Sequence, residues 1–218
     1  MRLVHEKNHF IWLTISMIGL MINGAITAEV PDSWTLELLE FVSVALLFLS
    51  LLSLRTNRKF AKGLLILVGL ILTTVVARNT TQMYYFEFSY LTLLLLFMFI
   101  AAWLVGSQVL LTGKVDLNII MGSVALYIII GYIFSIFYTL LLEFRPMAFK
   151  GIEVAAWYDN LPTTTYFSFV TLTTLGYGDI SPAIPLAQVI VILEAVTGMF
   201  YLAAIVASLI GSMKLEQK

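Results

Sequence analysis

Residues 171–179 read Thr-Leu-Thr-Thr-Leu-Gly-Tyr-Gly-Asp, and their types and spacing suit them to hold a cation. Gly176 and Gly178 lack a Cβ atom, so they can adopt the positive φ angles that turn successive backbone carbonyls toward one axis. The Thr174 hydroxyl can supply a further layer of oxygen atoms. Such layers replace the water shell of a dehydrated ion, and four chains around one axis would complete each layer.

The element that must position this segment is the stretch just before it. Residues 163–172 are predicted to form a short helix, with Pro162 near its first turn and Thr163 or Asn160 as possible caps. Residues 174–178 then leave helical geometry, which membrane depth tolerates only where protein covers the backbone or the backbone lines an aqueous path. We therefore expect a re-entrant helix followed by an ion-binding segment, rather than an ordinary glycine-rich turn.

The composition places the whole chain in a membrane. Of its 218 residues, 61% are hydrophobic and only 11% are charged, and the mean hydropathy is +0.99, which is too apolar for an ordinary soluble domain. The absence of cysteine excludes disulfides, thiolate metal sites and a cysteine nucleophile. Since no apolar segment pairs a nucleophile with a base, we expect neither enzymatic activity nor a cofactor. No nucleic-acid partner or small-molecule substrate is indicated.

Six apolar segments have about the length needed to cross a bilayer. They span residues 10–28, 36–54, 61–77, 90–111, 118–141 and 186–211, and the third is the shortest. Pro182 and Pro185 mark the start of the last segment. The fold class predicted is an all-α integral membrane protein with six transmembrane helices and the re-entrant helix between the fifth and sixth.

Basic residues predict the orientation, because cytoplasmic loops carry more of them. One side of the predicted membrane carries nine, and the other carries only Arg78, Arg145 and Lys150. The richer side holds Arg2, Lys7, Arg55, Arg58, Lys59, Lys62, Lys114, Lys214 and Lys218. We expect a multi-pass protein of the cell membrane, surrounded by lipids, with both termini cytoplasmic.

Residues 118–211 resemble the pore module of tetrameric potassium channels, in which an outer helix, a pore helix, a Thr-x-Gly-Tyr-Gly-Asp filter and an inner helix follow one another. The resemblance implies a potassium-selective homotetramer with potassium ions as the permeant ligand. The residues that would bind K⁺ in the selectivity filter are Thr174, Leu175, Gly176 and Tyr177, with Gly178 finishing the turn. Leu175 stands where Val or Ile is more usual, but its carbonyl remains available.

The same resemblance suggests residues that support the filter. Asp179 would lie at the outer mouth and accept a hydrogen bond from Tyr166, while Phe167 would help to hold the ring of carbonyls. Phe169 fits such a role and ordinary membrane packing equally well. Val170 occupies a position where some family members carry a carboxylate, so an acid pair through that position is absent here.

The last segment contains a hinge candidate and a cavity candidate. Gly198 matches the hinge glycine of the family, although close helix packing is an equally good reason for a glycine there. Met199, Leu202, Val206 and Ile210 fall along one helical face. They would line a cavity or an apolar constriction, and a lipid-facing stripe is the alternative.

Glu194 is the only carboxylate well inside a predicted span, and ionisable residues there are usually functional. It could brace the back of the pore helix through a Thr or Tyr hydroxyl, or take part in gating by responding to external pH.

The sequence divides into a four-helix region, residues 1–117, and the pore module, residues 118–218. The four helices resemble the sensor half of a voltage-gated channel, yet residues 89–113 hold no Lys, Arg, Asp or Glu. A helix without charge cannot do work in the membrane field. We therefore expect a passive, non-voltage-gated potassium channel. The alternatives are a poorly selective cation channel and a non-conducting membrane interaction subunit.

Overall fold

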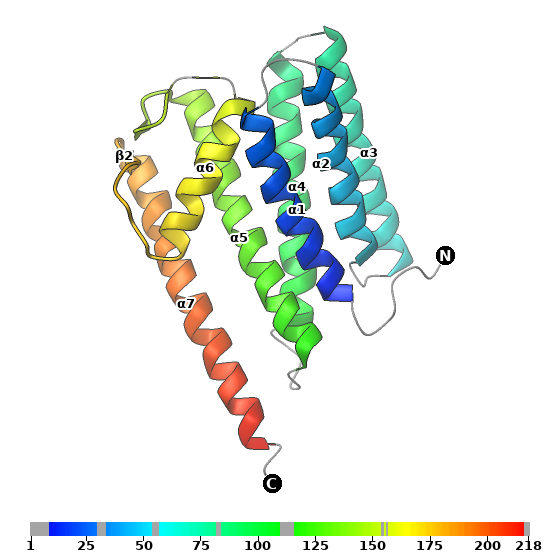
Figure 1. Ribbon diagram of the computed structural model, residues 1–218, viewed down its shortest axis with the longest axis vertical. Coiled ribbons are helices and arrows are strands. Elements are labelled where there is room, and N and C mark those ends of the chain that lie inside the picture. The colour runs from blue at the N-terminus through cyan, green and yellow to red at the C-terminus, as the bar shows by residue number, and fades with distance from the viewer. Residues whose placement is uncertain are drawn as a thin grey trace.

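The computed structural model describes residues 9–29, 34–53, 57–81, 84–109, 116–153, 155 and 157–215. They form seven helices and two short strands (Figure 1). The bounds are α1 His9–Glu29, α2 Trp34–Ser53, α3 Arg58–Thr81, α4 Tyr84–Val109, α5 Leu117–Phe144, β1 Phe149–Lys150, α6 Trp157–Leu172, β2 Ser181–Pro182 and α7 Pro185–Leu215. The long helices run alternately up and down, so α1 begins and α7 ends at the same end of the molecule.

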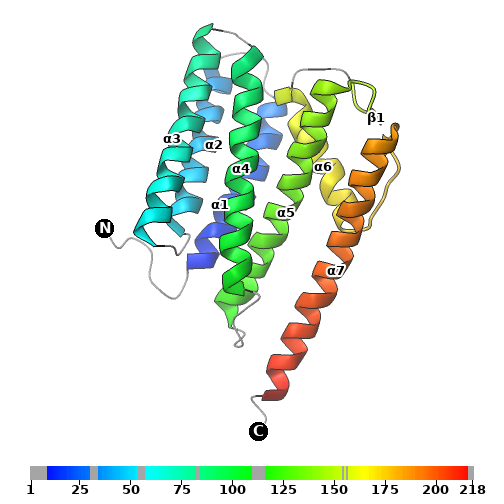
Figure 2. The ribbon, with the colours of Figure 1, turned by 180° about the vertical axis from the view of Figure 1, so that it is seen from behind.

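Helices α1–α4 form a bundle that packs on α5 of the same chain (Figure 2). Both α1 and α4 contact α5, and α2 and α3 lie on the far side of the bundle. The core contains fully buried apolar side chains from every one of these helices, including Leu13, Leu47, Ile71, Phe97 and Ile129. Burying their apolar surface fixes the four-helix region against the outer helix of the predicted pore.

Five helices contain stretches long and apolar enough to cross a membrane, within the residues that the structure describes. They are α1, α3, α4, α5 and α7, whereas the apolar stretch of α2, Leu38–Ser50, is shorter than a membrane span requires. The sequence had indicated the third segment as the shortest, and the apolar stretch of α3, Phe60–Ala77, has 18 residues, the fewest of the five, within a helix of 24 residues. Hydropathy marks the apolar middle of a helix, and its polar ends extend beyond that part.

Helix α6 lies between α5 and α7 and extends over only part of their length (Figure 1). Its 16 residues rise about 24 Å, short of the roughly 30 Å of a bilayer core. The chain enters α6 at the end of the molecule where α5 finishes, and residues 173–180 return toward that same end.

The start of α6 differs from the prediction. The helix begins at Trp157, six positions before Thr163, so the proposed caps Thr163 and Asn160 lie inside it. The Asn160 amide instead donates to the carbonyl of Ala155 at 2.8 Å. The Trp157 side chain is buried, and its ring centroid lies 4.9 Å from that of Tyr90. This tertiary packing favours an earlier start, although Pro162 removes one backbone donor from the helix and its ring crowds the carbonyl four residues before it.

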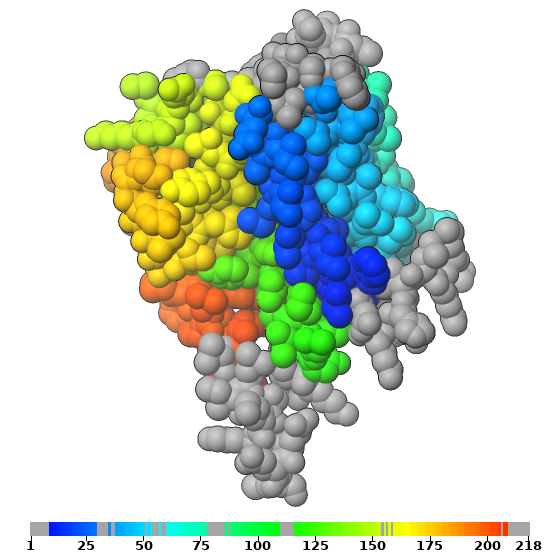
Figure 3. Space-filling model, viewed as in Figure 1, coloured from blue at the N-terminus to red at the C-terminus, as the bar shows by residue number. Residues whose placement is uncertain are grey.

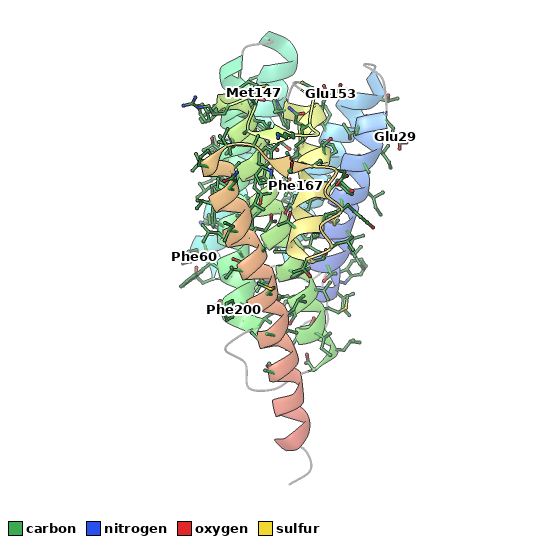
Figure 4. All side chains as sticks on the ribbon, turned by 90° about the vertical axis from the view of Figure 1, so that its left-hand side faces the viewer. Glu29, Phe60, Met147, Glu153, Phe167 and Phe200 are labelled. Carbon is green, nitrogen blue, oxygen red and sulfur yellow. The ribbon has the colours of Figure 1, made fainter. Side chains whose placement is uncertain are left out.

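A short antiparallel pairing joins the loop after α5 to the segment that follows residues 174–178. Phe149 pairs with Pro182 and Lys150 with Ser181, and the amide of Ala183 donates to the carbonyl of Ala148 at 2.8 Å. We call this pairing the β1–β2 clasp. Figure 4 shows Met147 and Glu153, which flank β1, at this end of the molecule.

Helix α7 starts at Pro185, close to the predicted start, and diverges from α5 toward its carboxyl end (Figures 1 and 2). Its apolar side chains are largely exposed, among them Leu186, Ile192, Leu193 and Phe200. Phe200, labelled in Figure 4, is 72% exposed.

Candidate functional site

The backbone of residues 174–178, which we call the filter segment, alternates in handedness. The φ angles are +60° at Thr174, +58° at Gly176 and +82° at Gly178. Positive φ at both glycines was predicted, but positive φ at Thr174 was not, because β-branched residues rarely adopt it. A positive φ angle at such a residue costs about 1–2 kcal/mol of conformational free energy. Alternation between right- and left-handed conformations turns successive amide groups to the same side of the chain.

The N–H groups at the start of the filter segment point back to the end of α6. The amides of Leu175 and Gly176 both donate to the carbonyl of Val170, at 2.9 and 3.2 Å, and the amide of Thr174 donates to Thr171 at 2.9 Å. Within the described residues, no hydrogen bond is accepted by a carbonyl of residues 174–178. The first three amides of the segment are thus bonded while its carbonyl oxygens are available, and available carbonyl oxygens are what a dehydrated cation requires.

The filter segment lies at the surface of the chain. Leu175 and Tyr177 are 56% and 67% exposed, and a Cβ atom added at Gly176 or Gly178 would meet nothing within 4 Å. Figure 3 shows this part of the chain, in yellow to orange, on an open face beside α6. The negative end of the α6 dipole also lies next to Thr174, and it favours a cation there.

Two of the predicted supporting residues meet each other. The Tyr166 hydroxyl donates to a carboxylate oxygen of Asp179 at 2.7 Å, as expected from the sequence. This hydrogen bond raises the pKa of the Tyr166 phenol above its usual value, because it favours the protonated form. Tyr166 therefore ties the middle of α6 to the residue that follows the filter segment.

Phe167 lies elsewhere. Its ring, labelled in Figure 4, packs against those of Tyr138 of α5 and Phe149 of β1, with centroids 5.3 and 5.5 Å away. Ile180 belongs to the same buried cluster. Within the chain Phe167 thus supports α5 and the β1–β2 clasp instead of touching the filter carbonyls, because a residue next to Tyr166 on a helix faces another direction.

Gly198 lies against the carboxyl end of α6. A Cβ atom at this position would be 2.2 Å from the carbonyl oxygen of Leu172, the last residue of α6. The Tyr127 hydroxyl donates to the same oxygen at 3.0 Å. Because α7 is helical through Gly198, close packing explains this glycine, and a hinge there stays a prediction. The role of Tyr127 was missed, since Leu172 lies 45 positions away.

Glu194 is fully buried one turn before Gly198. The Tyr138 hydroxyl donates to one of its carboxyl oxygens, and the other is hydrogen-bonded to the Ser168 hydroxyl. The predicted brace behind the pore helix is therefore present. A tyrosine partner was expected, whereas Ser168 was not.

The predicted cavity face is described only in part. Met199 and Leu202 are exposed, and Leu202 lines an apolar groove of about 360 Å³ between α5 and α7, which Tyr127 and Tyr201 also line. The side chains of Val206 and Ile210 lie outside the described residues.

Comparison with known proteins supports an ion channel. Residues 123–214 match a family model described as an ion channel, and this range contains most of α5, all of α6, the filter segment and nearly all of α7. No curated protein and no solved structure matches the chain. The matched domain and the apolar helices together indicate a multi-pass membrane protein with a non-enzymatic channel function.

Proposed function

We propose that this ion channel conducts potassium passively through a filter formed by four identical chains. The observation that carries the proposal is the alternating handedness at Thr174, Gly176 and Gly178, within a Thr-x-Gly-Tyr-Gly sequence that follows a half-length helix. The carbonyls of Thr174, Leu175, Gly176 and Tyr177 would bind dehydrated K⁺.

Exposure of the filter segment supports assembly. One chain leaves the filter segment and most of α7 uncovered, yet irregular backbone at membrane depth must be covered by protein or line a water-filled path. A fourfold arrangement satisfies both conditions, because neighbouring chains cover the sides of the segment while its carbonyls face the axis. In that arrangement α6 re-enters from the outer side, and the ring of Tyr177 points away from the ions.

Voltage is not the proposed stimulus. Helix α4 contains no Lys or Arg, so displacement of this helix carries no positive charge through the membrane field, which supplies roughly 2.3 kcal/mol per charge per 100 mV. The excess of basic residues on one side favours cytoplasmic termini in the cell membrane.

The decisive experiment is the reversal potential of the purified protein in planar bilayers, with potassium on one side and sodium on the other. We expect reversal near the potassium equilibrium potential and no dependence of open probability on voltage. Gly176→Ala should lose the selectivity, because its positive φ is strained for an L-residue. Gly69→Ala is the matched control, since Gly69 also has nothing within 4 Å but lies in α3 without positive φ.

The alternatives predict different recordings. Reversal near zero, with both glycine variants behaving like the wild type, would identify a poorly selective cation channel. A tetramer that stays silent under all conditions would identify a non-conducting interaction subunit. Either result would contradict a potassium-selective filter.

A further inference from the structure

Glu194 and its neighbours make three oxygen–oxygen contacts at hydrogen-bond distance, but the two neighbouring hydroxyl groups carry only two protons. Three oxygen–oxygen contacts follow one another: Tyr138 to one carboxyl oxygen of Glu194, the other carboxyl oxygen to Ser168, and Ser168 to the carbonyl of Gly131 at 2.7 Å. Each contact is a full hydrogen bond only if one proton lies between its two oxygen atoms, and a single Ser168 proton shared between two acceptors would leave both contacts weak. Tyr138 and Ser168 carry one hydroxyl proton each, and the carbonyl of Gly131 carries none.

For three full hydrogen bonds, the third proton comes from the carboxyl group, because the Gly131 carbonyl carries none. With a proton on Glu194, the Tyr138 hydroxyl donates to the first carboxyl oxygen, the carboxyl O–H donates to Ser168, and the Ser168 hydroxyl donates to Gly131. Every donor is then used once. Without that proton, Ser168 must choose between two acceptors, and two oxygen atoms within hydrogen-bond distance are left facing each other.

We propose that Glu194 is a neutral carboxylic acid at neutral pH, and that it acts as a positioning residue which joins α7 to α5 and α6 through this chain of hydrogen bonds. It is the only buried carboxyl among the described residues. Its role in conduction rests on the function proposed above, because the helix that it holds in place ends directly before the filter segment.

The groups around Glu194 offer no charge to balance an ionised carboxylate. From α5 it is faced by Tyr138 and, further away, by Tyr127, and from α6 by Ser168. Residues 185–213 of α7 include no other ionisable side chain except Tyr201, whose hydroxyl donates to Ser123. An uncompensated buried charge is costly, whereas a hydrogen-bonded neutral acid is not.

Glutamine distinguishes the two protonation states of Glu194. Its amide oxygen can accept from Tyr138 while its NH₂ group donates to Ser168, which copies the neutral acid but not the carboxylate. We expect Glu194→Gln to keep the thermal unfolding midpoint of the wild type. Glu194→Ala should lower it, because two buried hydroxyls lose their partner and a cavity forms.

The direct test is infrared spectroscopy of the purified full-length protein at neutral pH. The wild-type minus Glu194→Gln difference spectrum should contain the C=O stretch of a protonated carboxyl. The control, wild type minus Glu153→Gln, should contain carboxylate bands, since Glu153 is exposed. Carboxylate bands in the Glu194 difference, or a Glu194→Gln midpoint as low as that of Glu194→Ala, would overturn the assignment.

Potassium flux into vesicles tests the positioning role. Deprotonation in alkaline buffer should reduce wild-type flux, and Glu194→Gln flux should stay level, because glutamine has no proton to lose. Equal pH profiles for the two proteins would refute the link to conduction. The infrared and unfolding measurements need no current, so a protein that does not conduct potassium would contradict the proposed function and leave the protonation state testable.

Discussion

At the scale of single residues, Gly198 shows how contact and not flexibility can require a glycine. The carbonyl oxygen of Leu172 occupies the space of the missing side chain, and Tyr127 holds that oxygen from the other helix. The end of α6 is therefore held between α5 and α7, directly before the filter segment begins.

Gly198→Ala should force α7 away from α6. A Cβ atom 2.2 Å from a carbonyl oxygen cannot be accommodated without backbone movement, so we expect a loss of about 1–3 kcal/mol in the free energy of unfolding, together with reduced potassium flux. Unfolding by denaturant in micelles measures the free energy of unfolding, and potassium uptake into vesicles measures the flux.

The matched control for this substitution is Gly63→Ala in α3, where a Cβ atom meets nothing within 4 Å. Alanine favours a helix by up to about 1 kcal/mol over glycine, so this variant should be as stable as the wild type or more so. If Gly198→Ala and Gly63→Ala have the same free energy of unfolding and the same potassium flux, α7 can bend at Gly198 without cost, as a hinge would.

Residue-level sequence reasoning succeeded where one residue's chemistry was sufficient. The positive φ angles of Gly176 and Gly178 follow from their lack of a Cβ atom, and the Tyr166–Asp179 hydrogen bond follows from the family pattern. Positive φ at Thr174 is imposed by its neighbours, and the partnership of Ser168 with Glu194 depends on how three helices pack. Neither leaves a signal in the local sequence.

At the scale of elements, hydroxyl groups join α5 to α6. Thr139 lies 2.7 Å from Thr164, and Ser135 lies 2.7 Å from Thr165, measured between side-chain oxygens. Ser135, Thr139 and Thr164 are fully buried. These hydrogen bonds, which are directional, help to set the position of α6 along α5.

Thr139→Val and Thr164→Val test this interface as a double-mutant cycle. Each single variant leaves a buried hydroxyl without that partner, so we expect losses of about 1–3 kcal/mol in the free energy of unfolding. The double variant should lose less than the sum, because the two residues are in contact.

Thr92→Val is the control for the cycle, since the Thr92 hydroxyl is exposed and bonds only within α4. Strictly additive losses for Thr139 and Thr164 would show that the two hydroxyls stabilise the protein independently.

Some elements were predicted from the sequence more closely than others. The six predicted apolar segments coincide with the six long helices of the described residues, and five of these helices contain an apolar stretch long enough to cross a membrane. The early start of α6 was not predicted, because it depends on the packing of Trp157 against Tyr90, which is distant in sequence. The β1–β2 clasp was not predicted either, because each strand has only two paired residues and their partners are distant in sequence.

At the scale of the whole molecule, the proposal requires one chain to supply one quarter of a pore. Mixing wild-type and Gly176→Ala chains in equal amounts before assembly should leave about one sixteenth of random tetramers without a variant chain. If one altered filter strand is enough to disrupt the carbonyl rings, selective potassium flux should fall to near that fraction.

Wild-type chains mixed with Gly69→Ala chains provide the control, and their flux should be that of the wild type alone. Selective flux of one half in the Gly176→Ala mixture would mean that each chain conducts by itself, which contradicts the shared pore.

The β1–β2 clasp has a consequence for how such a chain can change over evolutionary time. Ala148 and Ala183 are joined by a backbone hydrogen bond, so everything between them leaves the helical framework and returns to it at one place. The Asp179 carbonyl, packed against Gly151, closes the same junction from inside. Residues 149–182 thus form a segment whose two ends meet at one place, so its exposed loop positions can vary in evolution while the contacts of α6 with α5 and α7 stay the same.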